Sequence, residues 1–164
     1  YIILISFDMP ICNINEFLKK GFFINKVMGI DIGKKRWGIA LSDPHNSFSL
    51  PHKVLCNNVN VYGDLNEIIE NYNVNLIVVG LPLNFDNSLN KKCQSIRDMT
   101  KHLDKKLSEF KKNLPILFWD ESFSTQQAND YVITQNISKR KKIIDKFAAS
   151  IILQDFLDFL EKNN

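Results

Sequence analysis

Hydrophobic and polar positions alternate with a short period early in this 164-residue chain. Over residues 27–42 apolar residues alternate with small or polar ones around a central Gly-Lys-Lys turn. This pattern predicts a β-hairpin with strands near 27–32 and 37–42. A third strand is expected over 48–55, and Pro51 indicates a sheet edge, because proline removes a backbone hydrogen-bond donor.

The later segments alternate between two other patterns. Apolar residues at helical spacing predict helices over residues 60–72, 88–112 and 142–160. Continuous apolar runs at 75–81 and 115–119 predict short strands that are covered on both faces, as in parallel sheets. The order indicates an α/β fold with a mixed five-stranded sheet, a three-strand antiparallel meander plus two parallel strands, flanked by helices on both faces.

Two further features lie between the last predicted strand and the last predicted helix. A helix start is expected at residues 124–127, because Ser124 precedes Gln127 by three residues. The basic run at residues 138–142 is expected to be a loop, which would place Asp145 in the first turn of the last helix.

The first 26 residues do not continue these patterns. We treat 1–26 as an N-terminal extension of unknown role, with a helical turn at 15–21, ahead of a domain over 27–164. The extension has no Arg and contains Asp8 and Glu16, whereas organellar presequences are rich in Arg and poor in acidic residues. We therefore expect a cytoplasmic protein; a plastid or mitochondrial location is the alternative if the extension is a presequence remnant.

Composition narrows the class of protein. With 45% hydrophobic and 24% charged residues, the chain resembles an ordinary soluble domain. No apolar run approaches the ~18 residues that span a bilayer, so no membrane partner is expected. Three widely separated cysteines without a CxxC pair argue against a disulfide framework and against a zinc site. The net charge of +3 is compatible with nucleic-acid binding but does not require it.

Three carboxylates occupy informative places. Asp31 interrupts an apolar strand, where a carboxylate is costly unless it is paired, hydrogen-bonded or bound to a metal. Glu121 directly follows a buried strand, and Asp145 lies near the start of the last helix. Sites in open α/β sheets form beyond the carboxyl ends of parallel strands, so we expect the three to converge there.

Carboxylates grouped without His or Cys suit Mg²⁺ or Mn²⁺. Two such ions about 3.5–4 Å apart activate water for phosphodiester cleavage. Each carboxylate also has a structural interpretation: a hairpin hydrogen bond, a solvated loop residue or a charge near a helix N-terminus. The basic run ends three residues before Asp145, where it would either neutralise phosphates or form a solvated face.

Four motifs, in order, resemble one known family. They are Gly29-x-Asp31-x-Gly33-x-Lys35-Arg36-x-Gly38-x-Ala40-x-Ser42-Asp43-Pro44, then Ile77-Val-Val-Gly-Leu-Pro-Leu-Asn84, then Trp119-Asp-Glu121, and last the basic run with Asp145-Lys-x-Ala-Ala149. Over roughly residues 27–160 the chain is similar to the YqgF/RuvX family of the RNase H-like superfamily, whose members are described as candidate Holliday junction resolvases or pre-16S rRNA nucleases.

The resemblance implies site residues. It places a catalytic, metal-binding triad on Asp31, Glu121 and Asp145, with Mg²⁺ or Mn²⁺ as cofactor and two ions when substrate is bound. The nucleic-acid contacts that we assign are Lys35, Arg36, Asn84, Lys139, Arg140, Lys141 and Lys142. Two positions depart from the family pattern: many members have Thr at position 34 and Arg at position 122, where this chain has Lys34 and Ser122.

Several functions follow from this resemblance. The first is a metal-dependent endonuclease on structured nucleic acid, above all one that processes the 5′ end of a small-subunit (16S-type) rRNA precursor. Holliday junction resolution is an alternative, which would favour a symmetric dimer with two sites. A non-cleaving RNA- or DNA-binding factor in ribosome assembly or transcription is an alternative of another class, motivated by Ser122. The expected partner is structured RNA or branched DNA, and the protein is a monomer or a homodimer.

Overall fold

The computed structural model describes residues 11–12, 14–82, 91–120 and 137–163. At residues 16, 20 and 137–146 it describes the backbone alone.

One mixed sheet organises the chain, with its strands in the spatial order β1-β6-β5-β2-β3-β4. The strands are β1 Ile11–Cys12, β2 Val27–Ile32, β3 Arg36–Ser42, β4 Ser49–Cys56, β5 Leu76–Leu81 and β6 Ile116–Asp120. β2, β3 and β4 pair antiparallel, whereas β5 pairs parallel with β2 and β6. The predicted meander and the two parallel strands are therefore confirmed.

The predicted strand number was wrong, because the described residues form a sheet of six strands rather than five. The additional strand is β1, which pairs parallel with β6 at Ile11 and Cys12. Two residues are too few to show a hydrophobic period, so the pattern of the sequence could not reveal this strand.

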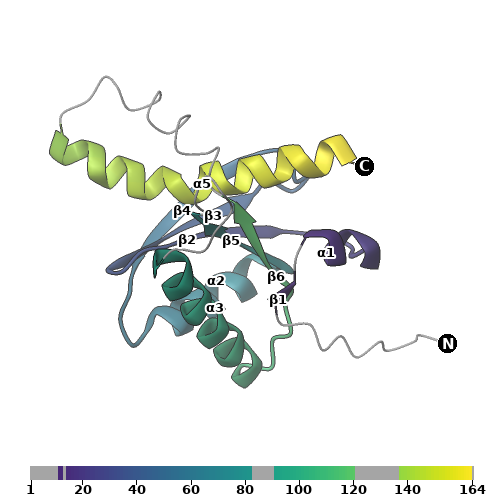
Figure 1. Ribbon diagram of the computed structural model, residues 1–164, viewed down its shortest axis with the longest axis horizontal. Helices are drawn as coiled ribbons and strands as arrows, with labels where there is room; N and C mark the ends of the chain where they lie inside the picture. Colours follow the sequence, from purple (N-terminus) through teal and green to yellow (C-terminus); the bar gives the residue numbers. More distant parts are fainter. Residues whose placement is uncertain (1–10, 13, 83–90, 121–136, 164) are drawn as a thin grey trace.

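Helices cover both faces of the sheet (Figure 1). They are α1 Ile14–Lys20, α2 Val61–Tyr72, α3 Lys91–Glu109 and α5 Ile137–Asn163. α2 and α3 lie below the sheet in this view, and α5 crosses above it. None of the helices in the described ranges is both long enough and apolar enough to span a membrane.

Pro51 lies where the sequence predicts, in the edge strand β4. The register of β4 shifts there, because Ile39 pairs with Lys53 whereas the next residue, Ala40, pairs with Pro51. This irregularity at an edge accommodates a residue that lacks a backbone N–H.

The side chains of β2 divide between two cores. Met28, Ile30 and Ile32 belong to the core on the α2 and α3 side, and Val27 belongs to the core beneath α5. Because side chains in a strand alternate between the two faces, Asp31 shares the α5 face with Val27.

The described part of the N-terminal extension packs on the sheet. α1 confirms the helical turn expected at 15–21. Cys12 and Phe17 are buried in the core beneath α5, and the ring of Phe17 stacks on that of Phe22 with 5.2 Å between centroids. The role of the extension and the domain boundary at residue 27 stay predictions.

The last helix begins earlier than predicted. α5 starts at Ile137, so the basic run at 138–142 belongs to the helix and is not a loop. Asp145 consequently lies eight residues after Ile137 and not in the first turn. Lys and Arg have good helix propensity, and a run of them gives no signal for where a helix starts.

The buried face of α5 differs at its N-terminal end from the face that helical spacing of apolar residues predicts, which includes Phe147 and Ala148. Phe147 is 43% exposed and Ala148 only partly buried, whereas Ala149 and Leu153 are fully buried. The helix lies so close to the sheet at Gly29 that the small residue Ala149 occupies the contact.

Candidate active site

Asp31 lies between two glycine positions of the sheet. It pairs with Gly38 of β3. On the other side, Ile30 pairs with Val79 of β5, so the next residue, Gly80, is level with Asp31. No side chain therefore flanks Asp31 on either neighbouring strand, and the residue is only partly buried in an otherwise buried strand.

α5 rests directly on the backbone of β2 beside this position. A Cβ atom added at Gly29 would lie 2.7 Å from the Cβ of Leu153 and 2.8 Å from the carbonyl oxygen of Ala149. Gly29 and Asp31 share one face of β2. Asp145 precedes Ala149 by about one helical turn, or ~6 Å along the axis, so α5 carries it on the same face of the sheet as Asp31. In Figure 1 the N-terminal half of α5 lies on the side of the molecule where the β2–β3 turn is.

The end of β6 is fixed to α5 through Trp119. The indole Nε1–H of Trp119 donates a hydrogen bond of 2.8 Å to Oδ2 of Asp155. The same indole contacts the rings of Phe156 and Phe159, with centroids 5.4 and 5.2 Å away. Trp119 therefore has its side chain on the α5 face, two residues before Glu121.

The predicted triad is only partly covered by the described residues. The structure places Asp31 with its side chain and Asp145 with its backbone, whereas Glu121 lies outside the described ranges. Among the described residues, no three His, Cys, Asp or Glu side chains gather into a metal-binding group. The convergence of the three carboxylates thus stays a prediction.

The β2–β3 turn presents its basic side chains to solvent and is held by backbone hydrogen bonds. The N–H of Gly33 donates to the carbonyl of Arg36 at 3.0 Å. Asn57 donates from its backbone N–H to the carbonyl of Lys35 at 2.9 Å and from Nδ2 to that of Lys34 at 3.0 Å. The predicted contact residues Lys35 and Arg36 are exposed.

The structure describes less of the other predicted contact residues. Asn84 lies outside the described ranges. Lys139, Arg140, Lys141 and Lys142 lie in the first turns of α5, where only the backbone is described. Their role in binding nucleic acid stays a prediction.

The Ser42-Asp43-Pro44 part of the motif lies at the opposite end of the hairpin from Asp31 and orders the β3–β4 turn. The carboxylate of Asp43 accepts hydrogen bonds from the N–H groups of Ser47 at 2.7 Å, Phe48 at 2.8 Å and His45 at 3.2 Å. These bonds, with that from Phe48 first, hold the pKa of Asp43 below its ordinary value. This carboxylate therefore has a structural role.

Sequence reasoning missed two residues that shape the site, Gly80 and Trp119. Gly80 stands at the end of a Val-Val-Gly run, but only the sheet register shows that it lies beside Asp31. Trp119 was expected only to be a strand residue, and its contact with α5 depends on a pairing distant in sequence.

The comparisons with known proteins agree with the sequence motifs. The RuvX model, described as Holliday junction resolvase, matches residues 25–159. A Pelagibacter ubique protein named "Putative pre-16S rRNA nuclease" is 37% identical over 142 residues, which cover 83% of this chain and 91% of the relative. A Mycoplasma mobile protein of the same name is 38% identical over 135 residues, covering 80% of this chain and 90% of the relative.

Among solved structures, RuvC of T. thermophilus in complex with a Holliday junction substrate is similar, with a TM-score of 0.47 and 10% identity over 77% of this chain and 90% of that one. The match to the family model over most of the chain, together with relatives of this identity and coverage, shows that the chain belongs to the RuvX family.

Proposed function

We propose that this protein is a divalent-metal-dependent endonuclease that processes the 5′ end of a small-subunit rRNA precursor. The observation that carries the proposal is the partly buried carboxylate of Asp31, which lies between two glycine positions on the face of the sheet that α5 crosses. Membership of the RuvX family and the names of the relatives supply the reaction and the substrate.

The described donor fits a hard divalent cation. Carboxylate oxygens are the ligands that Mg²⁺ and Mn²⁺ prefer, and both ions keep water ligands that need room beside the carboxylate. Gly38 and Gly80, on the two neighbouring strands, carry no side chain that could occupy this space. Asp31, Glu121 and Asp145 would together hold the ions. A bound pair of ions would supply an activated water and stabilise the leaving oxygen of the cleaved phosphodiester.

The residues of the chain position these groups. β2 is hydrogen-bonded to strands on both sides, so it fixes Asp31 within the sheet. The Trp119–Asp155 hydrogen bond joins α5 to β6, the strand that precedes Glu121. The close approach at Gly29 joins α5 to β2, the strand that carries Asp31. Both contacts therefore hold the helix that carries Asp145.

The exposed cations of the β2–β3 turn would bind the substrate near the cleavage position. Lys35 follows Asp31 by four residues, which span at most about 14 Å. Lys35 and Arg36 are exposed and would contact phosphates, which position a nucleic acid without reading its sequence. Sequence-independent contacts of this kind suit an enzyme that recognises the shape of a folded RNA.

The test compares wild type with Asp31→Asn, which keeps the shape of the side chain but removes its charge. Glu67→Gln is the matched control, because Glu67 is an exposed carboxylate on α2, on the opposite face of the sheet. The substrates are a 5′-extended small-subunit rRNA precursor and a four-way DNA junction, each with Mg²⁺ or Mn²⁺. Calorimetric titration of Mn²⁺ into each variant reports metal binding without cleavage.

Wild type and Glu67→Gln are expected to cleave the precursor RNA. Loss of a residue that only supports a metal ligand typically lowers activity by ~10–100-fold. Asp31→Asn removes a proposed ligand itself, so we expect a larger loss of activity. The unfolding midpoint of this variant should equal that of wild type. Equal cleavage by wild type and Asp31→Asn would refute the site. If the protein cleaves the DNA junction but not the precursor RNA, the rRNA substrate is refuted. That result would favour Holliday junction resolution, the activity given in the description of the family model.

A further inference from the structure

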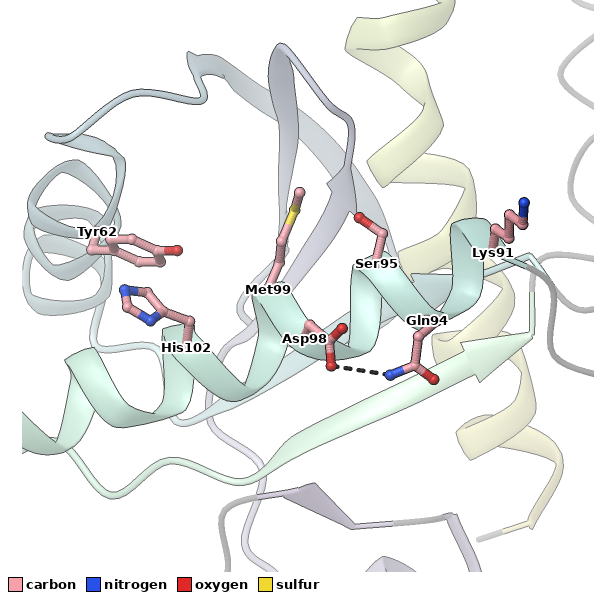
Figure 2. A pocket seen from close by; sticks show the side chains of 7 residues that line it. All are labelled: Tyr62, Lys91, Gln94, Ser95, Asp98, Met99 and His102. Carbon is pink, nitrogen blue, oxygen red and sulfur yellow. Dashed lines mark hydrogen bonds between the residues drawn. The ribbon is translucent and has the colours of Figure 1, made fainter.

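Two hollows on the α3 side of the sheet lie next to each other and share part of their lining. The first, of about 550 Å³, lies between α3 and the start of α2 (Figure 2). The second, of about 610 Å³, lies between α3 and the β2–β3 turn. Both are lined by Lys91, Ser95 and Met99, which are four residues apart and therefore share one side of α3. We call these two adjoining hollows the α3 groove.

One end of the α3 groove is basic. Lys34 of the β2–β3 turn and Lys91 and Lys92 of α3 line it, and all three are exposed. Within the described part of the chain, none of these three side chains forms an ion pair. The acidic lining residue Asp98 lies further along α3, where its Oδ1 accepts a hydrogen bond of 3.0 Å from Gln94. Positive charge at the basic end is therefore available to a phosphate group.

The other end of the α3 groove is aromatic. The rings of Tyr62 and His102 lie 5.1 Å apart between centroids, and Figure 2 shows both at the end of the groove away from Lys91. Tyr62 is held in place by the fully buried Trp37, whose ring it meets edge-on at 5.8 Å. Burial raises the pKa of Tyr62, so its ring stays neutral at ordinary pH. His102 is exposed and Tyr62 is partly buried, and aromatic rings that reach a surface in this way stack with nucleobases.

The dimensions of the groove fit a short strand of nucleic acid. Eleven residues separate Lys91 from His102, which corresponds to about 16 Å along a helix axis. At about 3.4 Å per nucleotide in a stacked strand, this length holds four or five nucleotides. A duplex keeps its base faces stacked on one another, so only an unpaired strand would use both ends of the groove.

We propose that the α3 groove binds a single-stranded RNA segment, with its phosphates on Lys34, Lys91 and Lys92 and its bases against Tyr62 and His102. The proposal deepens the proposed nuclease function and rests on it for the identity of the RNA. Lys34 follows Asp31 by three residues, at most about 11 Å of chain. The groove would therefore hold the unpaired strand next to the cleavage position, after the strand passes around the β2–β3 turn.

The test measures binding of a fluorescein-labelled ten-nucleotide oligoadenylate RNA by fluorescence anisotropy, in EDTA to prevent cleavage, over a series of salt concentrations. The variants are the triple substitution Lys34→Gln, Lys91→Gln, Lys92→Gln and the single substitution His102→Ala. The matched control replaces Lys53, Lys105 and Lys162 with Gln, because these exposed lysines lie outside the groove. Thermal unfolding of each variant shows that it is folded.

The triple groove variant is expected to lower the slope of log affinity against log salt by about 2, since each phosphate contact on a single strand contributes ~0.7. His102→Ala is expected to weaken binding about fivefold or more, as loss of one stacking partner does. The control triple variant should keep the slope of wild type, and binding of a ten-base-pair RNA duplex should not depend on His102.

Equal losses in the groove and control triple variants would overturn the proposal, because they would show only a general effect of charge. The proposal would also be overturned if His102→Ala bound the single-stranded RNA as tightly as wild type does. It would be overturned as well if His102→Ala weakened binding of the duplex as much as binding of the single strand. Binding in EDTA does not require catalysis. If the groove substitutions weaken RNA binding but the wild-type protein cleaves nothing, only the nuclease function is refuted. If the protein cleaves RNA but the groove substitutions leave binding unchanged, only this inference is refuted.

Discussion

Replacement of Gly29 by Ala tests the contact that joins α5 to the central strand. The added Cβ would lie 2.7 Å from the Cβ of Leu153 and 2.8 Å from the carbonyl oxygen of Ala149, whereas carbon atoms in contact sit about 3.5–4.0 Å apart. Neither of these neighbours is the flexible end of a side chain, so α5 must move away by about 1 Å. Such overpacking typically costs about 1–3 kcal/mol of unfolding free energy.

The same movement should affect catalysis. α5 carries the backbone of Asp145 about one turn before Ala149, whose carbonyl oxygen the added Cβ would meet. A displacement of about 1 Å at a catalytic group can lower a rate by ~100-fold. We therefore expect Gly29→Ala to lose most nuclease activity and Mn²⁺ affinity while it remains folded at 25 °C.

Thermal unfolding, followed by the cleavage assay on the same sample, measures both effects. For a chain of this size, the unfolding midpoint should fall by about 2–4 °C per kcal/mol lost. Gly63→Ala is the control, since nothing lies within 4 Å of a Cβ added there and Gly63 is in the helix α2. That change should raise stability by up to about 1 kcal/mol. A Gly29→Ala protein with the midpoint of wild type would refute the packing argument, and a destabilised but fully active one would refute the link to catalysis.

Two further changes test the hydrogen bonds that frame the sheet. The pKa of Asp43 is lowered in the folded state, so its contribution to stability is present above the ordinary pKa of Asp and is lost as pH falls through the folded value. Asp43→Asn should consequently be less stable than wild type at pH 6, and the difference should shrink in unfolding experiments as the pH is lowered below the ordinary pKa of Asp; a difference that does not fall with pH would contradict this assignment. Trp119→Phe keeps an aromatic ring against α5 but removes the bond to the half-buried Asp155, so urea unfolding should show a loss of about 1 kcal/mol. An unchanged midpoint in urea would mean that water replaces this bond without cost.

The central hairpin and the edge strand could be predicted from the sequence because their signals are local. Alternation with a period of two over residues 27–42 fixes which side chains share a face, and the Gly-Lys-Lys turn fixes where the chain reverses. Pro51 identifies the edge, because a central strand requires its backbone N–H. The position of Asp31 on the α5 face followed from the same alternation once the helix was placed.

The features that the sequence did not predict depend on contacts between distant segments. β1 is defined by its pairing with β6, more than 100 residues later, and its two residues have no pattern of their own. The face of α5 is set by how closely the helix approaches Gly29, and not by the size of its own side chains. The α3 groove combines Lys34 with Lys91, which only the tertiary structure brings together.

The glycines beside Asp31 reconcile the cost of a carboxylate in a central strand with its proposed use. A charged group that is shielded from water loses its hydration, and larger side chains at positions 38 and 80 would increase that loss. Because Gly38 and Gly80 add no side chain, Asp31 stays partly accessible although Ile30 and Ile32 on either side of it are buried. The accessibility that keeps the carboxylate partly hydrated would also let a hydrated cation approach it. The stability of β2 and the proposed metal binding at Asp31 would therefore depend on the same two glycines.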